Sequence, residues 1–241
     1  MRTRVTFNGV DLTRLFAVSN LNAPLLPREI ASQERTGGDG YVFTGARIGE
    51  RSISMTLTVH GKSPEDIRAA ERELAAILAV EEPAPLTLSI DNGIYWMAVA
   101  KADGNGKRFT HAARHDVTFV CHDPVAYGAH KVVTVPSGGS VSFRVGGTYP
   151  TIPIVRAPSA VRNNDGIWKL TLDGGDYLIA SLATGSATSI VADCQARVLK
   201  VAGVVKALQP AADWLVLTPG LHTLTMVGSG AATVEYQERW V

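Results

Sequence analysis

Residues with catalytic or metal-binding spacing are few in this sequence, and those that occur lack their usual partners. His111 and His115 lie four residues apart, the spacing at which two ligands on one helix face reach the same metal. The flanking residues alternate as in a strand, however, and no third ligand is evident. Residues 103–106 read Asp-Gly-Asn-Gly and begin like a calcium loop, but the remaining ligand spacing is missing, which is typical of a hairpin turn. We therefore expect no metal and no other cofactor.

Nucleophilic and acid–base patterns are equally poor. Cys121 and His122 are adjacent, and adjacent strand residues point to opposite faces of a sheet, so they cannot form a Cys–His dyad. The sequence contains no G-x-S-x-G motif, no Walker A loop and no G-x-G-x-x-G after a strand. Its carboxylates are scattered without a recognisable pair. We predict that the protein is not an enzyme and that Cys121 and Cys194 are free thiols, Cys121 as part of a core stripe.

Composition excludes further classes. The chain has 241 residues, with 23 basic and 22 acidic side chains and a formal net charge of +1. Such a balance is not typical of a nucleic-acid or membrane-surface binder. No stretch approaches the ~18 consecutive apolar residues of a membrane span, and the N-terminus lacks a signal-peptide core, so we expect a soluble protein made in the cytosol.

Strands and one helix account for the clearest patterns. Residues 51–60 alternate apolar and hydroxyl side chains, which predicts a half-buried strand. Residues 86–99 alternate on both sides of Asn92-Gly93, which indicates a hairpin. Ser63, followed by Pro64 and by an acidic residue at position 66, predicts the start of an amphipathic helix over residues 64–80.

A change in composition near residue 130 suggests two domains. The later part has fewer charges and more Val, Ala, Gly and Thr, with turn signals spaced as in a β-sandwich. The predicted fold is therefore mainly β. Residues 1–129 would form an α+β domain, a β-sandwich or barrel with one amphipathic helix, and residues 130–241 a β-sandwich.

One segment is unusual for a monomer. Residues 31–50 are polar, rich in glycine and long for a loop without structure of its own. Two interpretations stay open: a mobile surface hairpin, or an arm that becomes ordered by pairing with a neighbouring subunit. The candidate arm residues are Arg35, Gly37, Gly38, Asp39, Gly40, Tyr41 and Phe43.

Aromatic side chains raise a separate alternative. Trp168, Trp214 and Trp240 could supply the exposed aromatic platform of a carbohydrate-binding module, although packing between strands is the more common role of such residues.

The order of these segments resembles the distal tail protein (Dit) family of long-tailed bacteriophages. The resemblance begins with FNGVDLTRLFAV at residues 7–18, continues through the glycine-rich loop, and is most telling in VTFVCHDPVAYG at residues 117–128. GGTYPTIPI at residues 146–154 is similar to the start of the family's C-terminal sandwich. The positions that carry this likeness are Asp123, Pro124, Tyr127, Tyr149, Pro150, Pro219 and Gly220.

This resemblance implies a structural role in the virion. Family members form a hexameric ring at the tail tip, in which the N-terminal domain surrounds a channel and joins the tail tube protein to the tail-tip or tail-associated protein. Their galectin-like C-terminal domain can hold receptor-binding or side-fibre proteins. Assembly would take place in the bacterial host cytoplasm. The alternative remains a carbohydrate-binding module that uses the C-terminal β-sandwich, because a galectin-like fold does not by itself define a function.

Overall fold

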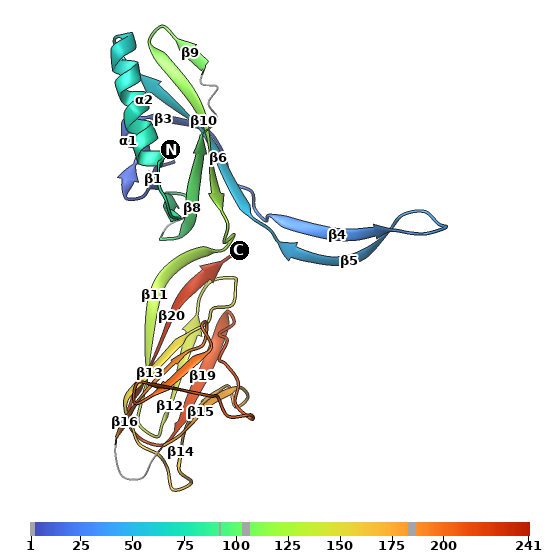
Figure 1. The fold of residues 1–241 in the computed structure, drawn as a ribbon, viewed down its shortest axis with the longest axis vertical. Coiled ribbons are helices and arrows are strands. Elements are labelled where there is room, and N and C mark those ends of the chain that lie inside the picture. The colour runs from blue at the N-terminus through green and yellow to red at the C-terminus, as the bar shows by residue number, and fades with distance from the viewer. Residues whose placement is uncertain (1–2, 92, 103–106, 183–186) are drawn as a thin grey trace. The chain divides into compact units, whose positions relative to one another are not determined.

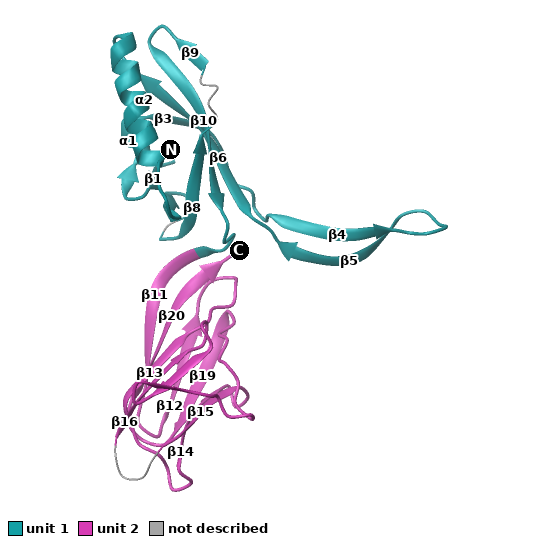
Figure 2. Cartoon of the chain, in the orientation of Figure 1, with its two compact units in different colours: residues 1–126, 241 teal, residues 127–240 magenta. Residues whose placement is uncertain are grey.

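The protein is composed mainly of β-strands, as predicted, in two compact units (Figures 1 and 2). The computed structural model describes residues 3–91, 93–102, 107–182 and 187–241. Unit 1 comprises residues 1–126 together with residue 241, and unit 2 comprises residues 127–240. The boundary that composition predicts, 129/130, falls inside strand β11 (Ala126–Val135).

Unit 1 is built on an antiparallel sheet that runs in the order β3, β6, β10 and β8. Strand β7 pairs with β8 and with β1, β1 pairs with β2, and β9 pairs with β10. The bounds are β1 (Val5–Phe7), β2 (Val10–Asp11), β3 (Ala17–Asn22), β6 (Arg51–His60), β7 (Ala84–Leu88), β8 (Tyr95–Ala102), β9 (Lys107–Phe109) and β10 (Ala112–Cys121).

The core of unit 1 contains the apolar residues that alternate in residues 51–60, but this strand is not half-buried as predicted, since Thr56 and Thr58 on its other face are buried too. Ile53, Met55, Leu57 and Val59 are all buried, because every second side chain of β6 points to the same face. From β10, Phe119 packs on this side against Phe7 of β1, with 4.9 Å between ring centroids.

Helix α2 (Pro64–Leu78) begins where the sequence predicted. Ser63 Oγ accepts a hydrogen bond from the Asp66 backbone N–H at 3.1 Å, and the Asp66 carboxylate accepts one from the Ser63 N–H at 3.0 Å. This reciprocal capping box satisfies amides that have no partner within the helix. Ile67, Leu74 and Leu78 form its buried face. The structure also has a one-turn helix, α1 (Leu12–Leu15), which the sequence analysis did not predict because four residues show no periodicity.

Removing the cap should weaken unit 1 measurably. We expect Ser63→Ala to lower the free energy of unfolding by about 1 kcal/mol, because the Asp66 N–H loses its acceptor. Urea denaturation measures this change. Ser32→Ala, at an exposed position, is the matched control and should change stability by less than about 0.5 kcal/mol. Equal effects of the two substitutions would contradict the capping role.

The predicted hairpin over residues 86–99 consists of β7 and β8, but the strands are joined by more than a two-residue turn. Thr87 is the last residue of β7 paired with β8, opposite Tyr95, while Leu88 is already paired with Val5. Asn92, half of the predicted turn, lies outside the described residues. The most buried side chains of β8 are Trp96 and Ala98 rather than the Tyr95, Met97 and Val99 stripe.

Unit 2 is a β-sandwich of two antiparallel sheets, which confirms the predicted fold class. One sheet runs in the order β18, β17, β16, β13, β20 and β11, and the other in the order β12, β19, β14 and β15. The bounds are β12 (Ser140–Val145), β13 (Ile154–Ala160), β14 (Ile167–Leu172), β15 (Tyr177–Ser181), β16 (Thr188–Asp193), β17 (Val198–Val201), β18 (Val204–Lys206), β19 (Gly220–Val227) and β20 (Ala232–Trp240). Apolar side chains from both sheets fill the space between them, with Trp168 the largest fully buried one.

Candidate assembly surfaces

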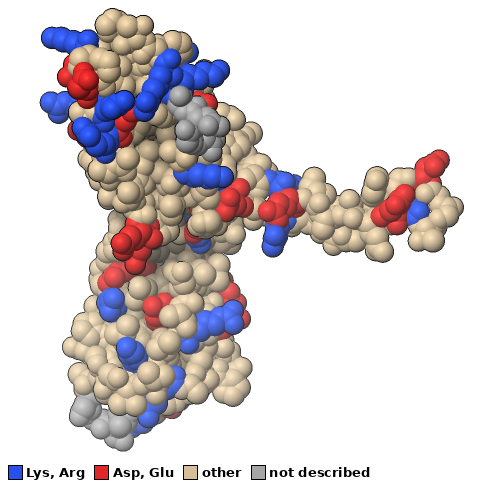
Figure 3. All heavy atoms as spheres, turned by 45° about the horizontal axis from the view of Figure 1, so that its top comes forward, with Lys and Arg blue, Asp and Glu red and all other residues tan. Residues whose placement is uncertain are grey.

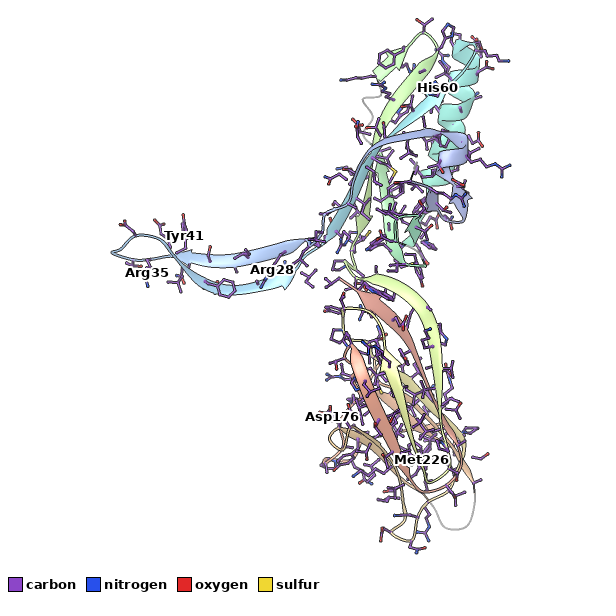
Figure 4. The ribbon with its side chains drawn as sticks, turned by 180° about the vertical axis from the view of Figure 1, so that it is seen from behind. Arg28, Arg35, Tyr41, His60, Asp176 and Met226 are labelled. Atoms are coloured by element: carbon purple, nitrogen blue, oxygen red, sulfur yellow. The ribbon has the colours of Figure 1, made fainter. Side chains whose placement is uncertain are left out.

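The segment that the sequence singled out as a long polar loop is an ordered hairpin of unit 1. Strands β4 (Arg28–Glu34) and β5 (Tyr41–Ile48) pair only with each other among the described strands. Figure 1 shows the hairpin extending away from the other strands of this unit. Every side chain of β4 is exposed. In Figure 4, Arg28 lies near the base of the hairpin and Arg35 and Tyr41 lie toward its tip.

The turn at the tip holds five of the seven candidate arm residues. The Arg35 N–H donates to the Gly40 carbonyl at 3.1 Å and closes the turn. Gly37 and Gly40 have φ angles of +80° and +90°, a backbone conformation in which glycine carries no side-chain penalty. The glycines noted in the sequence therefore serve the turn.

The two faces of this hairpin differ in chemistry. Directly paired residues share a face, and the register pairs Ile30 with Ala46, Ser32 with Phe43, and Glu34 with Tyr41. The same face continues to the pair of Arg28 with Ile48. We call the side chains of Ile30, Tyr41, Phe43, Ala46 and Ile48 the apolar face of the hairpin.

The opposite face is polar or small apart from Val42, which is 47% exposed. It carries an ion pair between Glu29 and Arg47, with 2.6 Å between Arg47 Nε and a Glu29 oxygen, and the pair of Gln33 with Val42. On the apolar face, by contrast, Ile30 is 67% exposed, Phe43 64% and Tyr41 72%. An isolated two-stranded hairpin is marginally stable in water, and a contiguous exposed apolar surface is typical of a site of protein contact.

The remaining positions of the family resemblance occupy turns and strand starts. Asp123 accepts a hydrogen bond from the Val125 N–H at 3.1 Å, which shapes the turn after β10. The carbonyl of Pro124, in the same turn, accepts a hydrogen bond from Arg51. Pro219 and Gly220 lead into β19, where Gly220 pairs with Val145.

Tyr127 and Tyr149 are brought together by an arginine that the sequence analysis did not identify. The guanidinium carbon of Arg239 lies 5.4 Å from the Tyr127 ring centroid and 5.2 Å from that of Tyr149. The Arg239 carbonyl also accepts hydrogen bonds from the N–H groups of Thr148 and Tyr149, which precede Pro150. No local pattern marks Arg239, because it lies 90 residues or more from both tyrosines in the chain.

Of the two histidines that suggested a metal site, His115 is engaged with a carboxylate of α2. His115 Nε2 lies 3.1 Å from a Glu71 oxygen, and Arg108 pairs with the same carboxylate at 2.9 Å. Among the described residues, no group of three or more metal-ligating side chains comes together. Residues 103–106 are outside the described part of the chain. In that described part, no helix is both long and apolar enough to cross a bilayer.

Charged side chains of both signs lie over α2 and β9, the elements that carry Glu71 and Arg108 (Figure 3). Figure 3 shows Lys and Arg side chains gathered over α2 and β9, with acidic side chains among them. The Arg108–Glu71 pair bridges these two elements directly.

The tryptophans proposed as an aromatic platform are largely used in packing. Trp168 is 1% exposed, and Trp214 packs against the core of unit 2. The Trp240 ring lies so close to Gly128 that an added Cβ there would be 2.2 Å from a ring carbon. The ring of Tyr177 is covered by Lys169, whose Nζ lies 3.7 Å from its centroid.

Both cysteines are free and buried, in agreement with the sequence analysis. Burial raises the pKa of the Cys121 thiol to about 12 and that of Cys194 to about 11. We expect both thiols to react with a maleimide at pH 8 roughly a hundredfold or more slowly in the folded chain than after denaturation, because the thiolate is the reactive form.

The same shifts predict a loss of stability at high pH. A folded-state pKa above the ordinary value of 9.0 favours folding fully below pH 9, and this contribution declines as the pH rises toward 11 and 12. Denaturant titrations at pH 8 and pH 10.5 on the wild type and on Cys121→Ala measure it. A pH dependence that is identical in the two proteins would contradict the assignment.

Family models match the chain in two successive stretches. The model described as a phage tail protein RIFT-related domain matches residues 9–121, and the model described as a siphovirus-type tail component, C-terminal domain, matches residues 146–240. The chain belongs to the siphophage distal tail protein family. It is therefore a structural component of the phage tail and part of the virion.

A solved structure shares the fold of this distal tail protein. The Dit protein of phage SPP1, described as a paradigm of the hub adsorption apparatus in phages that infect Gram-positive hosts, superposes with a TM-score of 0.77 at 20% identity, over 100% of both chains. A chain of the phage P2 baseplate in its activated conformation with Ca gives a TM-score of 0.49 at 10% identity, covering 99% of this chain and 98% of the other. No curated protein matches the chain significantly by sequence.

Proposed function

We propose that six copies of this chain form a closed ring at the tail tip, which joins the tail tube to the tail-tip proteins. Unit 1 builds the ring, and unit 2 is available to hold receptor-binding or side-fibre proteins. The observation that supports this proposal best is the β4–β5 hairpin, whose apolar face is largely exposed in the isolated chain.

Ring closure explains why such a hairpin is useful. A cyclic assembly needs a head-to-tail interface in which one surface of each subunit meets a different surface of the next. A projecting hairpin supplies the first surface, because it can reach a neighbour and bury its apolar face there. Association would remove Ile30, Tyr41 and Phe43 from water, which contributes about 25 cal/mol for each Å² of apolar area buried.

A function that depends on surface contacts also agrees with the state of the side chains that were considered for catalysis or metal binding. Cys121, the candidate nucleophile, is a buried thiol with a raised pKa, and His115 is engaged with Glu71. Carbohydrate binding by unit 2 finds less support, because Trp168 belongs to its core, the partly buried Trp214 packs against that core, and Trp240 packs on Gly128.

Light scattering coupled to size-exclusion chromatography, with electron microscopy of the same fractions, tests the proposal. We expect a ring with a central hole and a mass of about six times 25.6 kDa for the chain alone, or six copies of the chain in the complex formed after addition of its tail tube and tail-tip proteins. A chain that stays monomeric with these partners present would overturn the hexamer. A monomer retained on a glycan array would instead favour the carbohydrate-binding alternative.

A further inference from the structure

Arg51 is a buried arginine at the point where the chain returns from the hairpin to the sheet of unit 1. It is the first residue of β6 and is only 5% exposed. Its Nη1 donates to the Pro24 carbonyl at 2.5 Å, and its Nε donates to the Pro124 carbonyl at 3.0 Å. The guanidinium carbon lies 6.0 Å from the Trp96 ring centroid.

Removing the Arg51 guanidinium from water costs free energy, and no direct ionic partner offsets this cost among the described residues. No salt bridge to Arg51 occurs within the residues that the structure describes, and burial lowers the pKa of its guanidinium. The negative charge of Asp91 acts on it from a distance, and the neutral Cys121 thiol lies opposite it in β10. A buried charge held only by two carbonyls and an aromatic ring requires an explanation beyond packing.

The two carbonyls come from chain segments that are 100 residues apart in the sequence. Pro24 lies on the leg that enters the hairpin, four residues before β4 begins. Pro124 lies in the turn after β10. The planar guanidinium presents N–H groups in a fixed fork, so a single arginine can hold both carbonyls in one geometry, which the single ammonium of a lysine does less well.

The base of the hairpin is closed by few other hydrogen bonds. The Gly49 N–H donates to the Pro27 carbonyl at 2.7 Å, and the Arg28 N–H donates to the Leu26 carbonyl at 3.0 Å. Because the side chains of β4 are exposed along its length, contacts at this base decide the direction in which the hairpin leaves unit 1.

We propose that Arg51 is a positioning residue, which fixes the hairpin against the turn after β10 so that the apolar face is presented to a neighbouring copy of the chain. This inference deepens the proposed ring and rests on it for its assembly consequence. Its structural part, the fixing of the hairpin base, holds for the single chain.

Hydrogen exchange on the full chain tests the structural part directly. We expect Arg51→Met to accelerate exchange of the buried Gly49 amide about tenfold or more, because the entering leg loses its anchor, while the amide of Phe119 in the core changes less than about twofold. Arg51→Lys should give an intermediate acceleration. Arg35→Met, which removes an exposed arginine at the tip of the same hairpin, is the matched control and should leave Gly49 unchanged.

The results of these experiments distinguish a failure of the Arg51 proposal from a failure of the proposed ring. Unchanged Gly49 exchange in Arg51→Met overturns the positioning role, whatever the oligomeric state. If Arg51→Met does not fold, Arg51→Lys carries the test, and unchanged exchange there overturns the role equally. Faster exchange together with a concentration midpoint of assembly raised about tenfold supports both proposals. Faster exchange with wild-type assembly supports the fixing of the base and contradicts the use of the hairpin in the ring.

Discussion

A chain in which residues 28–48 are replaced by two glycines is expected to remain folded and to lose the ability to form the ring. The replacement is geometrically feasible, because the Pro27 carbonyl oxygen and the Gly49 nitrogen lie 2.7 Å apart. The strands removed pair only with each other, so the sheet and core of unit 1 lose no described pairing partner. We expect the thermal midpoint to change by only a few degrees, while light scattering reports monomers at concentrations at which the wild type assembles.

Point substitutions show which face of the hairpin is responsible. Phe43→Ser, on the apolar face, should weaken assembly about tenfold or more, since a buried Phe is worth about 1.5–3 kcal/mol. Val42→Ser, on the opposite face of the same strand, is the matched control and should have a much smaller effect. An intact ring after removal of residues 28–48 would refute the arm assignment, and equal effects of Phe43→Ser and Val42→Ser would refute the choice of face.

Gly147→Ala is expected to be among the most destabilising single substitutions in unit 2. A Cβ at this position would lie 2.2 Å from the Arg239 carbonyl oxygen, which already accepts hydrogen bonds from Thr148 and Tyr149. Gly147 also has a φ of +92°, which L-residues with a side chain rarely adopt. Conformational strain of about 1–2 kcal/mol and a backbone collision of about 1–3 kcal/mol together predict a loss of about 2–5 kcal/mol.

Gly203→Ala separates the two causes. Gly203 has a similar φ of +76° but nothing within 4 Å of the position of an added Cβ. The same substitution should therefore cost only about 1–2 kcal/mol there. Denaturant titration of both variants measures the difference, which reports the close approach of the backbone to Arg239. Equal losses at the two glycines would show that the collision near Arg239 is relieved at no cost.

Local patterns were sufficient for the regular elements. The alternation in residues 51–60 identified β6 and its buried face, and Ser63 with the acidic residue at position 66 marked the start of α2. Both patterns depend only on residues that are close in the sequence, so they can be interpreted without knowledge of the fold. The same reasoning was less successful for residues 86–99, where backbone hydrogen bonds from Asp91 to Leu88 and from Ile94 to Asp91 form a connection longer than the Asn-Gly turn suggested.

Long-range contacts were not accessible from the sequence. The polar composition of residues 31–50 indicated an unusual segment, but its apolar face depends on the β4–β5 register, in which a shift of one residue would move Phe43 to the other side. The Arg239 contacts with Tyr127 and Tyr149 likewise join residues far apart in the chain.

By itself, then, the amino-acid sequence determined a mainly β protein, its amphipathic helix, the absence of a recognisable catalytic pattern and, through the order of its segments, its likeness to distal tail proteins. Only the tertiary structure decided that Arg51 spans two distant carbonyls and that Phe43 and Ile30 lie on one exposed face. The physical reason is that periodicity and capping act over one or two turns of chain, whereas strand register and buried side-chain contacts are set by packing between segments with no spacing in common.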